Sequence, residues 1–413
     1  MPLQYINELL GLPELQLHNL LIINAEEVHL EAKPVAYKQP CPVCQSEEGV
    51  IRNGHNEPRK IRHLNLLGKR CYIVVPSLRL FCSHCQIDFV WVYEFVSPKQ
   101  RYSYLFHRQT VEQALGSTAA HSARMQEVPV STVQRMHQEA LPAESERLSK
   151  QAWYEAEHTS DLVLGVDDFA IKKGHTYNTG IHNLRGETLL DVLAGRKLED
   201  LRAYARTNPS FLALKPKAVV MDLAQMYHTW ISECFPDAIR IADRFHVHGY
   251  IIESVQAVRK SVQFTLSPRA KAILKRDHRL LNPPGDRLSE KRKIQLNVLL
   301  AFSPLLRKVW EWKEAFSHWY EYSPNVQVAT QGFHRWLQQG EHIDHESVQS
   351  TLKTMRNWQN EIINYHRCRW TNAIVEGRHN RIKAYQRRHY FTRNRVYYKA
   401  GILVECNRHR LSG

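Results

Sequence analysis

Three short apolar segments that each contain an aspartate at or near their end constrain the fold of this chain most. They are Leu162–Ala170, which carries Asp167 and Asp168, then Lys217–Asp222 and Ala238–Asp243. Such runs are typical of buried central strands, and a carboxylate at the end of one needs water, a hydrogen-bond donor or a cation. We therefore expect one sheet edge lined with the oxygen ligands that Mg²⁺ prefers. The alternative is that these acids cap helices or form turns.

The charge balance predicts a polyanionic partner. The 413 residues carry a formal net charge of +15, and 43% of them are hydrophobic and 23% charged, which suits a soluble globular chain of two or three domains. Nucleic acid is the simplest such partner, although a basic surface with another role is the alternative. No apolar run approaches the roughly 20 residues of a membrane span, and the N-terminus lacks a secretory signal. We expect a cytoplasmic protein.

Two closely spaced cysteine pairs predict a zinc ribbon within residues 1–100. Five of the eight cysteines precede residue 90, and four of them form C-x-x-C pairs: Cys41, Cys44, Cys82 and Cys85. Two such turns supply the four thiolates of one tetrahedral structural Zn²⁺. The stretch between the pairs has the pattern of a β-ribbon, in which Cys71 is expected to pack rather than to bind metal. Coincidental pairing is the alternative.

Residues 101–150 have a helical pattern that favours a helix-turn-helix. Two short helical segments precede Ser131–Leu141, where Ser131 is a candidate N-cap. If the third helix enters a DNA groove, its polar side chains would face the bases. Those candidates are Thr132, Gln134, Arg135 and Gln138. A three-helix bundle without a DNA role is the alternative.

Residues 155–250 have the element order of a ribonuclease-H-like α/β core. Three strands are followed by helix, strand, helix and strand, and the acids fall on the first and fourth strands. Because these two strands are neighbours in such a fold, Asp167 and Asp222 would face one metal pair. The expected strands are Leu162–Ile171, Tyr177–Leu184, Glu187–Ala194, Lys217–Asp222 and Ala238–Asp243, and the expected helices are Leu198–Arg206 and Gln225–Cys234.

Residues 251–360 read as a helical insertion that is rich in basic and aromatic residues, with a break at Asn282–Asp286. The rings either stack on DNA bases beside phosphate-binding lysines and arginines, or they form the core of the insertion. We favour the core. The aromatic residues in question are Trp310, Trp312, Trp319, Tyr320, Trp336 and Trp358.

The C-terminal segment, 361–413, contains a helix that begins near Trp370. Glu376, Asn380 and Lys383 are spaced i, i+4 and i+7 and therefore share one helical face. Thr371 or Asn372 is a candidate cap of this helix. Glu376 would complete a set of three acids with the two strand-end aspartates; a solvated charge on a basic helix is the alternative. The following tail is basic and aromatic, as a phosphate-binding surface would be.

Four blocks carry a resemblance to the DDE transposases of the ISL3 family of bacterial insertion sequences. They are G-V-D-D-F-A-I-K-K-G-H-T-Y, V-V-M-D-L-A-Q-M-Y, F-P-D-A-I-R-I-A-D-R-F-H-V and T-N-A-I-V-E-G-R-H-N-R-I-K, in the order of that family. An N-terminal zinc ribbon with a helix-turn-helix is also similar to it. Two departures occur: His379 replaces an asparagine of the pattern E-G-x-N-N-x-I-K, and R-R-x-Y-G-F is here Arg387–Thr392 without its glycine.

The resemblance implies cut-and-join DNA transposition by two-metal phosphoryl transfer. Asp167, Asp222 and Glu376 would form the triad that holds two Mg²⁺ about 3.5–4 Å apart. Water would first free a 3′-OH at the element end, and that 3′-OH would attack target DNA. Asp168, Asp243 and His246 would support these ligands, with His246 as a candidate phosphate contact. DNA contacts would come from Arg378, Asn380, Lys383, Arg387 and Arg388.

The implied partners are double-stranded DNA, as element ends and as target, and further copies of the chain in a homodimer or larger assembly on DNA. The expected location is the bacterial cytoplasm, at the nucleoid. Two other functions remain open. One is a zinc-ribbon and helix-turn-helix regulator with an inactive nuclease-like domain, which retention of all three acids disfavours. The other is a nuclease that cleaves DNA without joining strands, which the sequence does not separate from a transposase.

Overall fold

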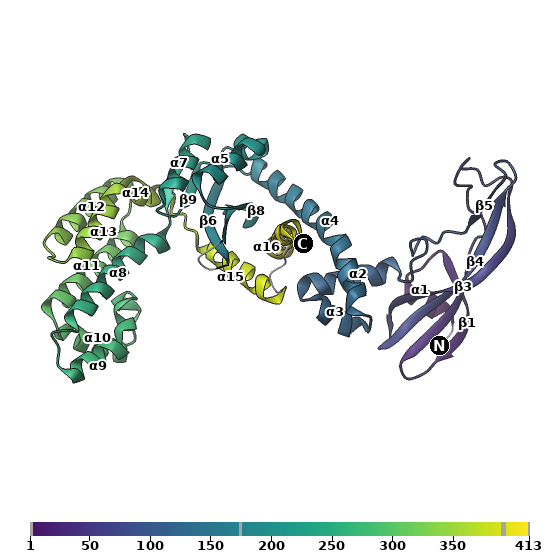
Figure 1. Cartoon of the computed structure of the whole chain (residues 1–413), viewed down its shortest axis with the longest axis horizontal. Coiled ribbons are helices and arrows are strands. Elements are labelled where there is room, and N and C mark those ends of the chain that lie inside the picture. The colour runs from purple at the N-terminus through teal and green to yellow at the C-terminus, as the bar shows by residue number, and fades with distance from the viewer. Residues whose placement is uncertain (1–2, 173–175, 390–393, 412–413) are drawn as a thin grey trace. The chain divides into compact units, whose positions relative to one another are not determined.

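The computed structural model describes residues 3–172, 176–389 and 394–411 of the chain (Figure 1). The chain divides into two compact units, Met1–Ala140 and Leu141–Gly413, and each is described here by itself. No helix in the described ranges is long and apolar enough to cross a membrane.

The first unit is built on a five-stranded sheet preceded by helix α1 (Leu3–Leu10). The strand order is β1-β2-β4-β3, with β5 also paired to β4. β3 and β4 form a long antiparallel hairpin, whose two-residue turn at Leu67 and Gly68 has positive φ at both positions, as such hairpins require. The strands are β1 (Leu15–Ile23), β2 (Glu27–Pro34), β3 (Val50–Leu66), β4 (Lys69–Cys82) and β5 (Ile87–Val90).

Three helices complete the first unit and begin the second: α2 (Tyr104–Gly116), α3 (Ala119–Gln126) and α4 (Val130–His158). Ser103 and Thr118 cap the first two helices through their side-chain oxygens. The expected cap at Ser131 is wrong, because α4 already begins at Val130 and Ser131 lies within its first turn. Phe106 of α2 packs with Met136 of α4, and Ala123 of α3 packs with Ala114 of α2 and Val133 of α4.

The second unit has a five-stranded mixed sheet whose strand order is β10-β9-β6-β7-β8. β6, β7 and β8 pair antiparallel, whereas β9 is parallel to β6 and to β10. The expected adjacency of the first and fourth strands is therefore confirmed, with Val166 of β6 opposite Met221 of β9. The strands are β6 (Val163–Lys172), β7 (Thr176–Asn183), β8 (Thr188–Ala194), β9 (Ala218–Met221) and β10 (Ile239–Ala242).

Helices cover both sides of this sheet. α5 and α7 lie along one side, and α15 and α16 pack against the other through a core that includes Phe169 and Ile382 (Figure 1). These helices, with the short α6 that follows α5, are α5 (Leu198–Thr207), α6 (Pro209–Ala213), α7 (Gln225–Cys234), α15 (Ala373–Arg388) and α16 (Arg395–Leu411).

Between β10 and α15 the chain forms a helical block with a broken stretch at 278–287, where two 3₁₀ turns replace α-helix as the Pro-Pro-Gly sequence predicts. The 3₁₀ turns are η1 (His278–Leu281) and η2 (Gly285–Arg287). The helices are α8 (Arg244–Val262), α9 (Pro268–Arg276), α10 (Glu290–Ala301), α11 (Pro304–Tyr322), α12 (Val326–Glu341), α13 (Glu346–Asn357) and α14 (Gln359–Cys368).

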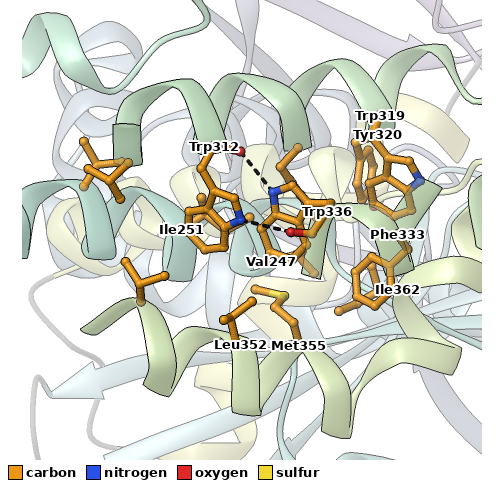
Figure 2. Packing of buried hydrophobic residues seen from close by; sticks show 14 of the residues in the cluster. Val247, Ile251, Trp312, Trp319, Tyr320, Phe333, Trp336, Leu352, Met355 and Ile362 are labelled. Atoms are coloured by element: carbon orange, nitrogen blue, oxygen red, sulfur yellow. Dashed lines mark hydrogen bonds between the residues drawn. The ribbon is translucent and has the colours of Figure 1, made fainter. Parts of the chain in front are cut away.

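The aromatic residues of this block form its core, so the favoured interpretation is confirmed. Trp312 and Trp336 stack with ring centroids 4.5 Å apart, and the indole N–H of each donates to the backbone carbonyl of the other (Figure 2). Trp319 and Tyr320 are also buried. Trp310 and Trp358, the remaining rings, pack at the edge of the same core. A buried indole with a satisfied N–H stabilises packing and is not available to stack on a base.

Candidate metal centres and DNA-binding surfaces

The first candidate centre is the cysteine cluster of the first unit. Cys41, Cys44, Cys82 and Cys85 bring their sulfur atoms within 4.8 Å of one another. The two C-x-x-C turns share one feature, since Gln45 and Gln86 directly follow them and both have positive φ. The two turns present four sulfur donors to one point, which is the ligand set of a structural zinc site.

The electrostatics of the four thiols fit a cation among them. Burial raises the pKa of Cys41, but hydrogen bonds from the backbone N–H groups of Cys44 and Val43 and from the thiols of Cys82 and Cys44 together lower that pKa to about 7. The thiols of Cys44, Cys41 and Cys82 in turn raise the pKa of Cys85 to about 12. Four sulfur atoms this close therefore resist full ionisation unless a positive charge lies between them. Cys71 lies apart from the cluster, fully buried in the ribbon core as expected.

The second candidate centre lies where the parallel pairing of β6 with β9 ends. Asp167 lies on β6, and Asp222 directly follows β9. Because β6 and β9 are paired neighbours, the two carboxylates meet at one sheet edge. His246, in the first turn of α8, joins them, and one ligand atom from each of the three residues lies within 4.8 Å of the others.

The two aspartates are held as a buried like-charged pair. Burial raises the pKa of Asp167 well above its ordinary value, and the nearby charge of Asp222 raises it further. Burial also raises the pKa of Asp222, with further contributions from Asp243 and Asp168. Mutual repulsion in a poorly solvated position is unfavourable for both carboxylates. A divalent cation would remove that cost, so the donor set fits a bound metal.

The start of α15 is fastened to this sheet edge. Asn372, directly before the helix, donates its backbone N–H to Asp243 Oδ1 at 3.1 Å and its side-chain N–H to the carbonyl of Val166 at 3.4 Å. Gly165 has no room for a side chain, because an added Cβ would come within 2.8 Å of Asn372 Oδ1 and 3.1 Å of Val375 Cγ2. Asn372 is thus the N-cap residue of α15, as one of the two expected candidates, but its side chain bonds across the interface and makes no cap hydrogen bond. The hydroxyl of Thr371, the other candidate, accepts the backbone N–H of Ala373 at 3.4 Å.

About two turns further along α15, His379 contacts Asp167. Its Nδ1 lies 3.4 Å from Asp167 Oδ2, and burial lowers the pKa of His379 to about 4. The imidazole is therefore neutral at neutral pH and can offer one N–H to the carboxylate. The sequence marked His379 only as a departure from a family pattern. Its contact with Asp167 emerges from the packing of α15 on β6.

Glu376 faces the same space without touching the aspartates. It lies in the first turn of α15 and is exposed. Asp167, Asp222, His246 and Glu376 all line one cleft of about 1270 Å³. The three acids expected to act together therefore share a cleft, but only the two aspartates are within ligand distance of each other.

The cleft also contains two of the residues predicted to bind DNA. Asn380 and Lys383 line it and are exposed, on the face of α15 that also carries Glu376, as the i, i+4, i+7 spacing predicts. Arg387 is exposed near the end of the helix, and Arg388 forms an ion pair with Glu405.

Arg378 does not fit its predicted role in DNA binding. It is only 5% exposed, and its guanidinium donates to His182 Nδ1 at 3.0 Å. Position 378 falls on the sheet-facing side of α15, so the side chain stabilises packing there. The departure from the family pattern over Tyr390–Thr392 lies outside the described residues.

The same cleft is lined by the three residues expected to support the acids, Asp168, Asp243 and His246. Asp168 pairs with Arg196 at 2.9 Å, and Asp243 is 5% exposed and accepts the Asn372 hydrogen bond. Sequence patterns did not predict that Arg196 lies at the site, because nothing in its local pattern indicates that the chain after β8 returns to β6. In the first unit, Gln134, Arg135 and Gln138 are exposed on α4, and Thr132 is half-buried.

Comparison with known proteins gives the family. Residues 164–402 match the model of the ISL3 transposase family, whose description is transposase, and residues 38–85 match the zinc finger of the transposases of IS204, IS1001, IS1096 and IS1165. The transposase for insertion sequence element IS1001 of Bordetella parapertussis is 27% identical over 376 residues, which cover 89% of this chain and 88% of that protein. The first match spans more than half of the chain, which therefore belongs to the ISL3 family of DDE transposases.

Proposed function

We propose that this transposase binds the terminal inverted repeats of an insertion sequence and cleaves and joins DNA with Asp167, Asp222 and Glu376 as its catalytic acids. The observation that carries the proposal is the meeting of Asp167 and Asp222 where the pairing of β6 with β9 ends, in a cleft that Glu376 also lines. The strand order, with three antiparallel strands and the fourth beside the first, supports a ribonuclease-H-like core.

Each acid has a distinct role in this proposal. Asp167 and Asp222 are fixed by the sheet and present oxygen donors from one side, while Glu376 approaches from α15 on the other. Divalent cations bound there, two Mg²⁺ in the family's chemistry, would lower the pKa of the attacking water or 3′-OH and stabilise the leaving oxygen. His379 and Asn372 keep α15 in position against Asp167 and the end of β6. Lys383 and Asn380 would hold the DNA backbone in the cleft.

The cysteine cluster would bind one structural Zn²⁺, and helices α2–α4 would bind DNA as a helix-turn-helix. The exposed polar residues of α4 suit groove contact, because base edges are read by hydrogen bonds. In the full-length protein, Arg135→Ala is expected to reduce the preference for terminal repeats over random DNA. Arg206→Ala, an exposed arginine of α5, is the control for a general loss of positive charge. If the wild type and Arg135→Ala prefer terminal repeats over random DNA equally, α4 is not part of the DNA-binding surface.

A strand-transfer assay tests the whole proposal and separates it from the two other functions. Purified protein is incubated with labelled terminal-repeat DNA, target plasmid and a divalent cation. A transposase frees the 3′ end and joins it to the target. Cleavage without joined product would indicate a nuclease, and repeat binding without cleavage would indicate a regulator with an inactive core. Because joining needs two ends, we also propose that two or more copies assemble on DNA at the nucleoid.

A further inference from the structure

On the basis of the proposed function, we propose that His246 is a direct ligand of the cation held by Asp222, and that this nitrogen donor makes the site prefer a transition-metal ion such as Mn²⁺ over Mg²⁺. His246 then has a defined chemical role beyond the three acids, and it sets which cation the cleft selects.

The position of His246 follows from the parallel pairing of β9 and β10. Ala242 at the end of β10 pairs with Met221 at the end of β9, so the chain leaves both strands at the same level. Asp222 follows one strand, and α8 begins two residues after the other. His246 lies in the first turn of α8, which brings its ring over the end of β9. The order of the elements thus places one imidazole beside the carboxylates at the edge of the sheet.

The separation of the two side chains suits two neighbouring ligands of one cation. His246 Nε2 lies 3.0 Å from Asp222 Oδ1. Nevertheless Oδ1 is fully buried and has no hydrogen-bond partner, because the nitrogen and oxygen are not aligned to share a proton. Neighbouring ligands at right angles, each about 2.1 Å from an octahedral cation, are about 3.0 Å apart. An aligned hydrogen bond would have indicated a supporting role for His246 instead.

The identity of the donors determines the selectivity. Mg²⁺ prefers oxygen ligands and keeps its waters, and carboxylates alone would suit it. An imidazole adds affinity for first-row transition ions, in the order that begins at Mn²⁺ and rises toward Cu²⁺. A set of two carboxylates and one imidazole therefore favours Mn²⁺ relative to Mg²⁺. His246 is 41% exposed at its side chain, so a cation can reach it from the cleft without rearrangement of the core.

The test is Mn²⁺ binding to the full-length protein with its ribbon zinc retained, followed by electron paramagnetic resonance and by competition with Mg²⁺. Pulsed spectra of the wild type should contain a nitrogen coupling to bound Mn²⁺. His246→Asn should remove that coupling and lower Mn²⁺ affinity about tenfold or more, while Mg²⁺ affinity changes much less. His318→Asn is the matched control, since His318 lines the same cleft outside the cluster and should leave the coupling intact.

The outcomes distinguish this inference from the proposed function. If the wild type binds Mn²⁺ and Asp222→Asn abolishes binding, but no nitrogen coupling is present, His246 is not a ligand and the inference is overturned while the acid site stands. If Asp222→Asn binds Mn²⁺ as the wild type does, the acid site itself is wrong. The wild-type spectrum decides the question even if His246→Asn folds poorly, and His246→Gln provides a second variant.

Discussion

The two metal-type clusters of this chain are assembled in opposite ways. In the cysteine cluster, each pair of donors comes from one short turn, and a glutamine with positive φ follows each turn. In the carboxylate cluster, Asp167, Asp222 and His246 come from three different elements: the middle of β6, the residue after β9 and the first turn of α8. The first cluster is therefore visible in local spacing, whereas the second exists only once the sheet has formed.

The energetic roles of the two clusters differ as well. A metal that ties two turns together contributes directly to folding, because the unfolded chain has no preformed site. The carboxylate pair destabilises the fold in the absence of a cation, because bringing two buried like charges together is unfavourable. We therefore expect loss of a cysteine to damage structure and loss of an aspartate to damage chemistry.

The largest structural effect is expected for Cys82→Ser. Structural zinc in zinc-finger peptides binds with about 10–16 kcal/mol, so loss of one thiolate should release the ion and unfold the ribbon. Zinc content measured by mass spectrometry should fall from about one per chain, and proteolysis should become rapid between the two cysteine pairs. Cys71→Ala, a buried cysteine outside the cluster, should keep the zinc. A zinc-free wild type with an intact, protease-resistant ribbon contradicts the zinc assignment.

A smaller effect is expected where α15 meets the sheet. Gly165→Ala would place a methyl group against Asn372 and Val375, at a cost of about 1–3 kcal/mol for overpacking. Because α15 carries Glu376, a shift of about 1 Å can lower the cleavage rate about a hundredfold. Gly249→Ala, in α8 with open space around it, should instead stabilise the protein by about 0.5–1 kcal/mol. Thermal unfolding and the cleavage rate are measured for both variants. If the two variants have equal stability and equal cleavage rates, α15 is not held in position at Gly165.

The aspartate pair should make the stability of the protein depend on pH with a sign opposite to that of an acid in an ion pair. Both folded-state pKa values are raised, so the native protein binds more protons than the unfolded chain between the ordinary value of 3.8 and the raised values of about 8 and about 7. The free energy of unfolding of the metal-free protein should therefore fall as pH rises through this window. Asp222→Asn should make this decrease in the free energy of unfolding smaller, and Mn²⁺ should turn the decrease into an increase. If the wild type without divalent cation instead gains stability over this pH range because of these two groups, the two aspartates are not buried as a pair.

The smallest effect is expected for His379→Asn, which restores the residue of the family pattern. The side-chain nitrogen of asparagine is at the same bond distance from the backbone as Nδ1 of histidine, so the N–H to Asp167 can be kept. Cleavage should stay within a few-fold of wild type. His379→Leu removes the donor and should lower cleavage by about tenfold, the equivalent of about 1.4 kcal/mol. Equal rates for the two variants would show that the contact does not position Asp167.

Local patterns predicted much of the fold. The boundaries of α7 match their expectation, Gln225–Cys234, and the five strands and α5 lie within a few residues of theirs, whereas the short α6 was not expected. Apolar runs and turn residues suffice there, because each element is short and strongly patterned. The exception is α4, whose start and length depend on tertiary packing: it runs through Pro142 to His158.

Side-chain environments were harder to predict than elements. Arg378 and Asn380 are two positions apart on α15, yet one is buried against His182 and the other lines the cleft. Helical spacing separates the two faces but does not reveal which one packs on the sheet. Arg196 reaches Asp168 from the segment after β8, whose path depends on the whole domain. The sequence and the family resemblance therefore predicted the acids and His246, whereas the contacts of Arg196 and His379 with the aspartates are found only in the folded chain.

The central claim is that Asp167, Asp222 and Glu376 act as one catalytic set, and the exposed position of Glu376 makes it the member to test. The measurement is divalent-cation-dependent nicking of a labelled element end by Glu376→Gln, beside Asp286→Asn, which removes another carboxylate of the same cleft. Loss of a catalytic ligand should lower the nicking rate about a hundredfold or more without weakening DNA binding, while Asp286→Asn should nick normally. Normal nicking by Glu376→Gln, or an inactive Asp286→Asn beside it, would contradict this assignment of the third acid.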